Sequence, residues 1–331
     1  DNRVSIDGIV GTSPDMAGTR LGVRASGPEL HNIALLTGVP HLPVGPFEFS
    51  ANIALDPDRL AFTDAVATVG ELQASAAGTV GLGDDIGDFD VVASVGGPNA
   101  ARLAELEFLR EFEGEAISVR GHVSRRRDRG ELEFDETHVR IGDIEVSADG
   151  TLSLEPRSND SDLKFTVAGP DIGRVGRAVD IDILPAKAFS IGGQFRGTPS
   201  GFAMRDFAAQ VGGSDINGAF DVDLRGKPRL TGVLSSAFLD LSERLPLDDP
   251  QTEVRVAETE QALLMPTEPI DAAVLQAANV DLDLRIDRLV ANALDVTDFN
   301  VGISLQDGTL LVDPIAYAES SGKVGGRILL T

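Results

Sequence analysis

The sequence predicts a mainly β protein, in which repetitive antiparallel strands form a curved, elongated sheet (a β-taco or groove) with short helices between the units. The first observation is a recurring Gly-Pro pair at Pro28, Pro98 and Pro170, which follows an apolar stretch each time at steps of 70 and 72 residues. The second is the alternation of apolar side chains from residues 47, 117 and 189 onward. A period of two is typical of strands that bury one face.

Each repeat is predicted to contain four strands. The alternating first strand is followed by a polar turn and then by a second strand. The second strands share a pattern in which two apolar residues at alternate positions are followed by an acid. This pattern occurs at residues 60–64, 132–136, 202–206 and 294–298. Gly70, Gly142 and Gly212 lie six residues after the acid and predict a tight turn into the third strand. A fourth strand, at 88–95, 162–169 or 228–235, leads out of the unit.

The repeats indicate one array over residues 1–331. We place a partial unit at about 1–45, full units at about 46–112, 113–187 and 188–245, and a last unit at 262–331 that follows a polar loop at 246–261. A four-strand unit with one apolar face cannot bury that face alone, so neighbouring units are expected to pair edge to edge. Small inner residues such as Ala51, Gly121 and Gly193 favour strongly bent strands, and a sandwich of two sheets is the alternative.

The composition excludes several classes of site and partner. The chain has no Cys, which rules out disulfides and thiolate metal sites. It has 53 acidic and 28 basic residues and a net charge of −25, which argues against nucleic-acid binding and against adsorption to an anionic membrane. Apolar residues make up 42% of the chain, so general disorder is not expected.

The chain contains no apolar run near the roughly 20 residues that are needed to cross a bilayer. It also has no signal-peptide pattern and does not begin with Met. We therefore expect any membrane anchor to lie outside this chain.

Three stretches carry a resemblance to a known family. They are "FAMRDFAAQVGGSDINGAFDVDLRGKPRLTGVLSSAFLDLSERL" at 202–245, "LLMPTEPIDAAVLQAANVDLDLRIDRL" at 263–289 and "LDVTDFNVGISLQDGTLLVDPIAYAESSGKVGGRILL" at 294–330. One unit ends with an apolar strand followed by Asp-Leu. The last region then begins with a Pro, a short helix and an Asp-Leu-Asp-Leu segment. In these features the chain resembles the AsmA-like proteins (AsmA/TamB type) of Gram-negative bacteria, most clearly from residue 188 onward.

The resemblance implies a non-enzymatic protein of the cell envelope. Its body would lie in the periplasm, anchored to the inner membrane by an N-terminal helix that this chain does not include. The body would form a β-groove that conducts lipids between the two membranes or supports outer-membrane assembly. Its partners would be phospholipid or another acyl-chain lipid, and possible further partners are envelope proteins. The resemblance supplies no catalytic residue, metal or cofactor.

The alternating strands would place apolar side chains inside such a groove and charged ones outside. The predicted lining residues are Phe47, Phe49, Ile53, Ile117, Val119, Val123, Phe189, Ile191, Phe195, Leu282, Leu284 and Ile286. Filled by acyl chains, this surface would be removed from water at a gain of roughly 25 cal/mol per Å². The alternative is that these side chains pack only against each other.

Chemistry of other kinds finds little support in the sequence. The four histidines, His31, His41, His122 and His138, show no metal-ligand spacing. The Asp- and Gly-rich segment 81–90 lacks the order of an EF-hand, and we interpret it as a solvated hairpin turn rather than a calcium site. The basic run at 125–129 is interpreted as a hairpin tip, with docking of anionic headgroups or an acidic partner as the alternative.

The acids Asp64, Glu136, Asp206 and Asp298 recur once per unit, which favours a role in the scaffold over catalysis. Two other functions stay open beside lipid handling. One is a structural or adhesive β-repeat protein with a dry core, which binds partners on its outer surface. The other is a carbohydrate-active β-solenoid enzyme, which needs two acids roughly 5–10 Å apart. The absence of Trp and the single Tyr disfavour the enzyme, because sugars usually stack on aromatic rings.

Overall fold

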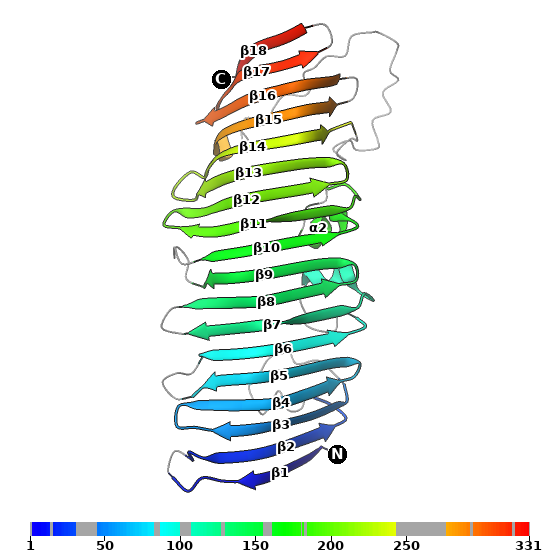
Figure 1. The fold of residues 1–331 in the computed structure, drawn as a ribbon, viewed down its shortest axis with the longest axis vertical. Coiled ribbons are helices and arrows are strands. Elements are labelled where there is room, and N and C mark those ends of the chain that lie inside the picture. Colours follow the sequence, from blue (N-terminus) through cyan, green and yellow to red (C-terminus); the bar gives the residue numbers. More distant parts are fainter. Residues whose placement is uncertain are drawn as a thin grey trace. The chain divides into compact units, whose positions relative to one another are not determined.

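All eighteen strands in the described part of the chain belong to one largely antiparallel, open sheet, seen in a computed structural model (Figure 1). The structure describes residues 2–13, 16–30, 45–82, 87–99, 107–126, 130–154, 161–179, 181, 184–242, 276–291, 294–319 and 322–330. Two helices lie entirely within these residues, the α-helix α2 (Ile172–Ala178) and the 3₁₀ helix η3 (Glu107–Phe112). The mainly β prediction is confirmed, and the sandwich alternative is wrong because the strands form one sheet.

The chain divides into two compact units, which are described separately. The first comprises Asp1–Pro170 with the short segments Arg177–Asp180 and Gln194–Gly197, and the second comprises Asp171–Gly176, Ile181–Gly193 and Thr198–Thr331. The strands before helix α2 are β1 (Arg3–Ile9), β2 (Thr19–Gly27), β3 (Phe47–Leu55), β4 (Arg59–Val69), β5 (Leu72–Gly81), β6 (Phe89–Gly97), β7 (Ile117–Arg126), β8 (Glu131–Ile141), β9 (Ile144–Ser153) and β10 (Asp162–Gly169). Those after it are β11 (Phe189–Thr198), β12 (Gly201–Val211), β13 (Ser214–Asp223), β14 (Arg229–Asp240), β15 (Asn279–Ala291), β16 (Leu294–Gln306), β17 (Thr309–Glu319) and β18 (Gly322–Leu330).

In the first unit, strands β1 to β10 form an antiparallel meander in which each strand pairs with the next. In the second unit, β12 to β18 follow the same order, but β14 and β15 are parallel. A parallel pair needs a long crossover, and the connection from Leu241 to Ala278 supplies one. The predicted polar loop at 246–261 falls in this connection and lies outside the described residues.

The glycines predicted to make tight turns do so. Gly70 begins the two-residue loop between the paired residues Val69 and Leu72, and Gly142 and Gly212 begin the corresponding loops of the next repeats. Their φ angles of 56° to 58° suit the first central residue of a type II′ turn, which L side chains rarely adopt. The last repeat uses Asp307 and Gly308 instead, both with positive φ, as a type I′ turn requires.

The acid that recurs in each repeat has a structural explanation. Asp64, Glu136, Asp206 and Asp298 all have φ between 46° and 52°, and the register of the sheet shifts at each of them. Each acid is therefore the left-handed residue of a β-bulge. Asp tolerates this conformation better than most L residues, which accounts for its recurrence.

Glu136 is the one member of this set with a longer side chain, and it gives a test of the bulge. We expect Glu136→Asn to raise the free energy of unfolding by about 0.5–1 kcal/mol, because Asn adopts left-handed φ at lower cost. The matched substitution Asp64→Asn should change stability by less than about 0.5 kcal/mol, since Asp already tolerates the angle. Urea unfolding followed by circular dichroism measures both, and equal effects would contradict the explanation.

Of the helices predicted after the Gly-Pro pairs, the one after Pro170 is confirmed as α2. Asp171 precedes this helix, where its Oδ1 accepts a hydrogen bond from the backbone N of Arg174 at 3.3 Å, as an N-cap residue does. The segment after Pro98 reaches the short η3, and the segment after Pro28 falls largely in residues 31–44, outside the described part of the chain.

Candidate functional site

The hydrogen-bonded register places the predicted lining residues of the first unit on one apolar face. Phe49 and Val119 belong to a single line of side chains that takes one residue from each of ten strands. From β1 to β10 the line is Val4, Ala25, Phe49, Ala67, Ala74, Val95, Val119, Val139, Val146 and Val167. Phe47, Ile53, Ile117 and Val123 share the face, because they lie an even number of residues away on the same strands.

The second unit has an apolar face of the same kind. Leu284 belongs to a line that runs through β12 to β18 as Phe207, Gly218, Leu234, Leu284, Val301, Ile315 and Gly326. Leu282 and Ile286 flank it on β15. Phe189 and Ile191 share one face of β11, and Phe195, which is counted with the first unit, lies on the same face of that strand. Whether these surfaces line a lipid groove stays a prediction.

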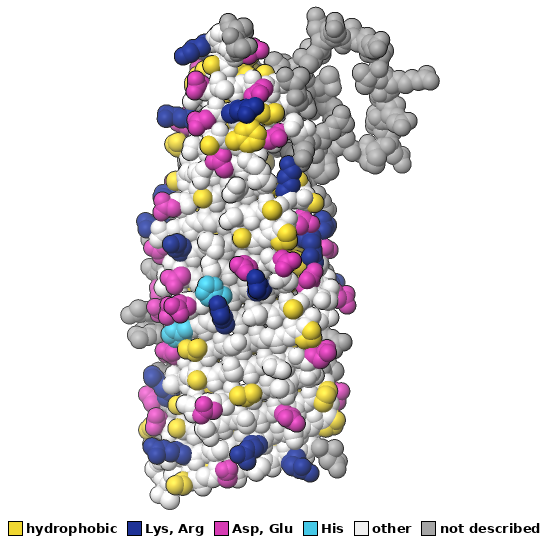
Figure 2. All heavy atoms as spheres, turned by 45° about the vertical axis from the view of Figure 1, so that its right-hand side comes forward, with side chains coloured by type: hydrophobic (Ala, Val, Ile, Leu, Met, Phe, Trp, Pro, Cys, Tyr) yellow, Lys and Arg dark blue, Asp and Glu magenta, His cyan; other side chains and the backbone are white. Residues whose placement is uncertain are grey.

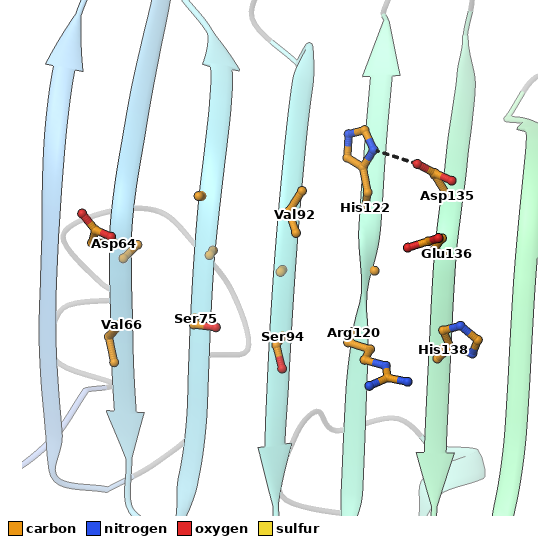
Figure 3. Close-up of a pocket in the computed structure, with 15 residues that line it drawn as sticks. Asp64, Val66, Ser75, Val92, Ser94, Arg120, His122, Asp135, Glu136 and His138 are labelled. Carbon is orange, nitrogen blue, oxygen red and sulfur yellow. Dashed lines mark ion pairs between the residues drawn. The ribbon is translucent and has the colours of Figure 1, made fainter.

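The apolar face is buried mainly at one end of the strands. In the first unit Phe47, Leu72, Ile117 and Ile144 are the first residues of β3, β5, β7 and β9, and all four are buried. Leu109 and Phe112 of η3 are buried as well, and both Figure 1 and Figure 3 place η3 behind the sheet near this end. Within the described residues, η3 therefore covers one margin of the apolar face.

In the second unit the buried side chains gather on β15 and β16. Ile286, Leu289 and Val296 form a core cluster, with Val296 only 1% exposed. Partly buried neighbours pack against it, among them Leu284, Phe299 and Tyr317.

Elsewhere the apolar face is incompletely covered. Among the described residues only fifteen apolar side chains are buried, and many in the central parts of the strands, such as Phe49 and Val119, are half-buried. On the edge strand β1, Val4 and Ile6 are each 61% exposed on this face. No second sheet packs on it within the described residues, since every strand belongs to one sheet. Within the described part of the chain, this face is thus left partly exposed.

Arg125 interrupts the apolar face of the first unit near the end of β7. It lies between Phe89 of β6 and Leu132 of β8, and it is the only charged residue among the paired apolar-face positions of β1 to β10 in the described chain. Its Nε atom is buried without a hydrogen-bond partner in the described structure. The interpretation of 125–129 as a hairpin tip is wrong for Arg125 and Arg126, which belong to β7, and 127–129 lie outside the described residues.

Sequence reasoning missed Arg125, although the signal was present. Arg125 continues the phase of Ile117, Val119 and Val123, which an alternating pattern assigns to the apolar side. Arg125 is also one of four arginines within residues 125–129. Because such a basic run is typical of a solvated turn, the sequence favours a turn over a continued strand at this position.

The opposite face is polar and carries charges of both signs, interspersed over the strands (Figure 2). In the first unit it is hollowed by an open cavity of about 970 Å³ that crosses β4 to β8 (Figure 3). Asp64, Val66, Ser75 and Ser94 line its β4–β6 side, and Arg120, His122, Glu136 and His138 line its β7–β8 side.

His122 is held between carboxylates of the two neighbouring strands. Its Nε2 is 2.9 Å from Oδ1 of Asp90, and its Nδ1 is 3.6 Å from Oδ2 of Asp135. The hydrogen bond to Asp90 is the main cause that raises the pKa of His122 above its ordinary value. These pairs therefore stabilise the fold below the ordinary histidine pKa and less as the pH rises, by a small amount because both carboxylates are exposed.

Other sequence features lie partly outside the described residues. His31 and His41 do, and so do residues 83–86 of the Asp- and Gly-rich segment, whereas Asp90 of that segment pairs with His122. The described residues contain no group of three or more His, Cys, Asp or Glu arranged to bind a metal ion. They also include no helix of the length and apolarity that would cross a bilayer.

Comparison with known proteins gives no match: no protein family, no curated protein and no solved structure is significantly similar to the chain. A function for the chain is therefore inferred from the side chains on the two faces of the sheet.

Proposed function

We propose that this protein is a non-enzymatic, periplasmic lipid-handling module, in which the apolar face of the sheet receives the acyl chains of lipids. In this role it would serve lipid transport between the two membranes or the assembly of the outer membrane, as its resemblance to AsmA-like proteins implies. The observation that carries the proposal is the apolar face itself: it is continuous across all ten strands of the first unit, yet half-exposed.

Physical chemistry favours an apolar ligand on such a face. Apolar surface left in water costs roughly 25 cal/mol per Å², so a face that no second sheet covers gains stability from any apolar ligand. The side chains along it are mostly Val, Ala, Ile, Leu and Phe, which contact acyl chains without leaving a polar group unsatisfied.

Arg125 supports a lipid with an anionic headgroup. A guanidinium at the margin of an apolar surface suits a phosphate, because its N–H donors match two phosphate oxygens.

Native mass spectrometry of the chain, purified from a bacterial host without detergent, tests the proposal. We expect adducts with the masses of phospholipids, and the same lipids in an organic extract of the protein. The alternative of a structural or adhesive protein with a dry core predicts neither. A lipid-free spectrum, together with no uptake of added phospholipid, would contradict the proposal.

A further inference from the structure

Strand β1 is an edge strand of the first unit (Figure 1). It pairs with β2 from Arg3 to Ile9, and within the described residues no other strand pairs with it. All seven of its residues are exposed. Alternate residues of a paired strand turn their backbone groups away from the partner, so the outer side of β1 presents a row of N–H and C=O groups to a further strand.

This edge lacks the features that usually prevent pairing with another chain, such as Lys, Pro or a β-bulge. The strand reads RVSIDGI, and its register with β2 does not shift. Its apolar side chains Val4 and Ile6 are each 61% exposed, so a further strand would remove them from water. By contrast, β18 carries Lys323, Arg327 and three glycines, all of which disfavour pairing.

The residues of β1 complement a second copy of the same strand. With the two copies antiparallel and Ser5 opposite Ser5, Arg3 of each copy lies opposite Asp7 of the other. The same register puts Val4 opposite Ile6 on the apolar face. Opposite charges and apolar side chains across a strand pair both stabilise it. A shift by two residues in either direction loses both charge pairs, and a shift by one brings apolar side chains to the polar face.

The two charged side chains are free to make these contacts. Within the described residues, neither Arg3 nor Asp7 makes an ion pair or a side-chain hydrogen bond. They lie on the same face of β1 but four residues apart, roughly 13 Å along the strand, so they do not meet within one copy. A second copy in the register above would pair both.

We propose that β1 is a docking surface for a second copy of this chain, which adds its own β1 as an antiparallel neighbour. The two copies are related by a two-fold axis that passes between the two Ser5 residues, perpendicular to the sheet. Such an axis keeps both apolar faces on the same side and makes the contact self-complementary. The sheet then continues from one copy into the other.

A second copy fits this edge better than a strand of another protein does. Any strand can pair with the backbone of β1, but only a second copy uses the symmetric placement of Arg3 and Asp7 about Ser5. The interface is one strand wide, and each copy carries a net charge of −25, so we expect a weak dimer that forms at physiological rather than low ionic strength.

Sedimentation equilibrium of the full chain over a range of concentrations tests the proposal. We expect a reversible monomer–dimer equilibrium. Arg3→Asp and Asp7→Arg each put like charges opposite at both contacts, so each variant alone should dimerise at least about tenfold more weakly. A mixture of the two variants should recover an affinity within about threefold of the unaltered dimer, because one copy then presents two acids and the other two bases. Lys323→Asp on β18 is the control and should change nothing.

Cysteine crosslinking tests the register, since the chain has no Cys of its own. In the proposed dimer Ser5 lies opposite itself, with Cβ atoms about 5 Å apart, so Ser5→Cys should give a covalent dimer on oxidation. Ile9→Cys is the matched control on the same exposed strand. Its two copies would lie roughly 27 Å apart and should not crosslink.

Four results would overturn the proposal. They are a monomer at every concentration, a dimer that neither charge substitution weakens, a mixture of the two variants that stays monomeric, or Ile9→Cys crosslinking as fully as Ser5→Cys. Recovery in the mixture also shows that each variant is folded. None of these results depends on bound lipid, so the test is independent of the lipid proposal.

Discussion

Val119→Glu is expected to reduce the lipid that co-purifies with the protein at least tenfold. Val119 lies in the middle of the apolar line, between Val95 of β6 and Val139 of β8. A carboxylate there would have to lose its water to let an acyl chain pass, at a cost of several kcal/mol. Quantification of lipid phosphorus per mole of purified protein measures the effect.

The neighbouring substitution Ser118→Glu is the matched control. Ser118 precedes Val119 on β7 and points to the polar face, where its side chain is exposed. The charge change is the same, so the lipid content should stay at the wild-type value. Val119→Asn, which is neutral, should show a smaller loss, and circular dichroism shows whether each variant is folded. Equal lipid content in folded Val119→Glu and Ser118→Glu would contradict the assignment of the faces.

Gly150→Ala is expected to destabilise the sheet by about 1–3 kcal/mol. Gly150 lies inside β9 with φ of 118°, an angle that L side chains rarely adopt. A Cβ atom there would lie 2.2 Å from the backbone oxygen of Asp162 on β10, so the backbone of one strand would have to move. The midpoint of urea unfolding, followed by circular dichroism, measures the loss.

Gly96→Ala in the same unit is the control for this prediction. The nearest atom to its added Cβ is the backbone oxygen of Ile117 at 3.4 Å, an ordinary contact. The substitution should change stability by less than about 1 kcal/mol, and the lower entropy of the unfolded chain acts in its favour. A Gly150→Ala variant as stable as Gly96→Ala would contradict the close approach of β9 and β10.

The sequence predicted the strands and turns well because both depend on local patterns. Alternation along 47–55 or 117–125 shows which side chains share a face, and Gly70, Gly142 and Gly212 mark turns that need positive φ. The single open sheet agrees with the prediction. The recurrence of Asp64, Glu136, Asp206 and Asp298 indicates a role in the scaffold. Their positive φ angles explain that role, and the sequence pattern alone does not reveal these angles.

Other features depend on which strand pairs with which, and in what register. Val4 and Val167 are far apart in the sequence, and only the pairing of the strands between them puts both in one apolar line. The parallel pairing of β14 with β15 likewise interrupts the antiparallel order that the repeat predicts. Such relations arise from tertiary structure and leave no periodic signal.

Site-specific photocrosslinking on β11 tests the central claim most directly. A photoreactive residue at Ile191, on the apolar side, and one at Ser190, on the exposed side, differ by one position. With the full protein in cells, we predict lipid crosslinks from Ile191 and none from Ser190. Crosslinks from Ile191 to protein alone would contradict the claim that this face holds lipid.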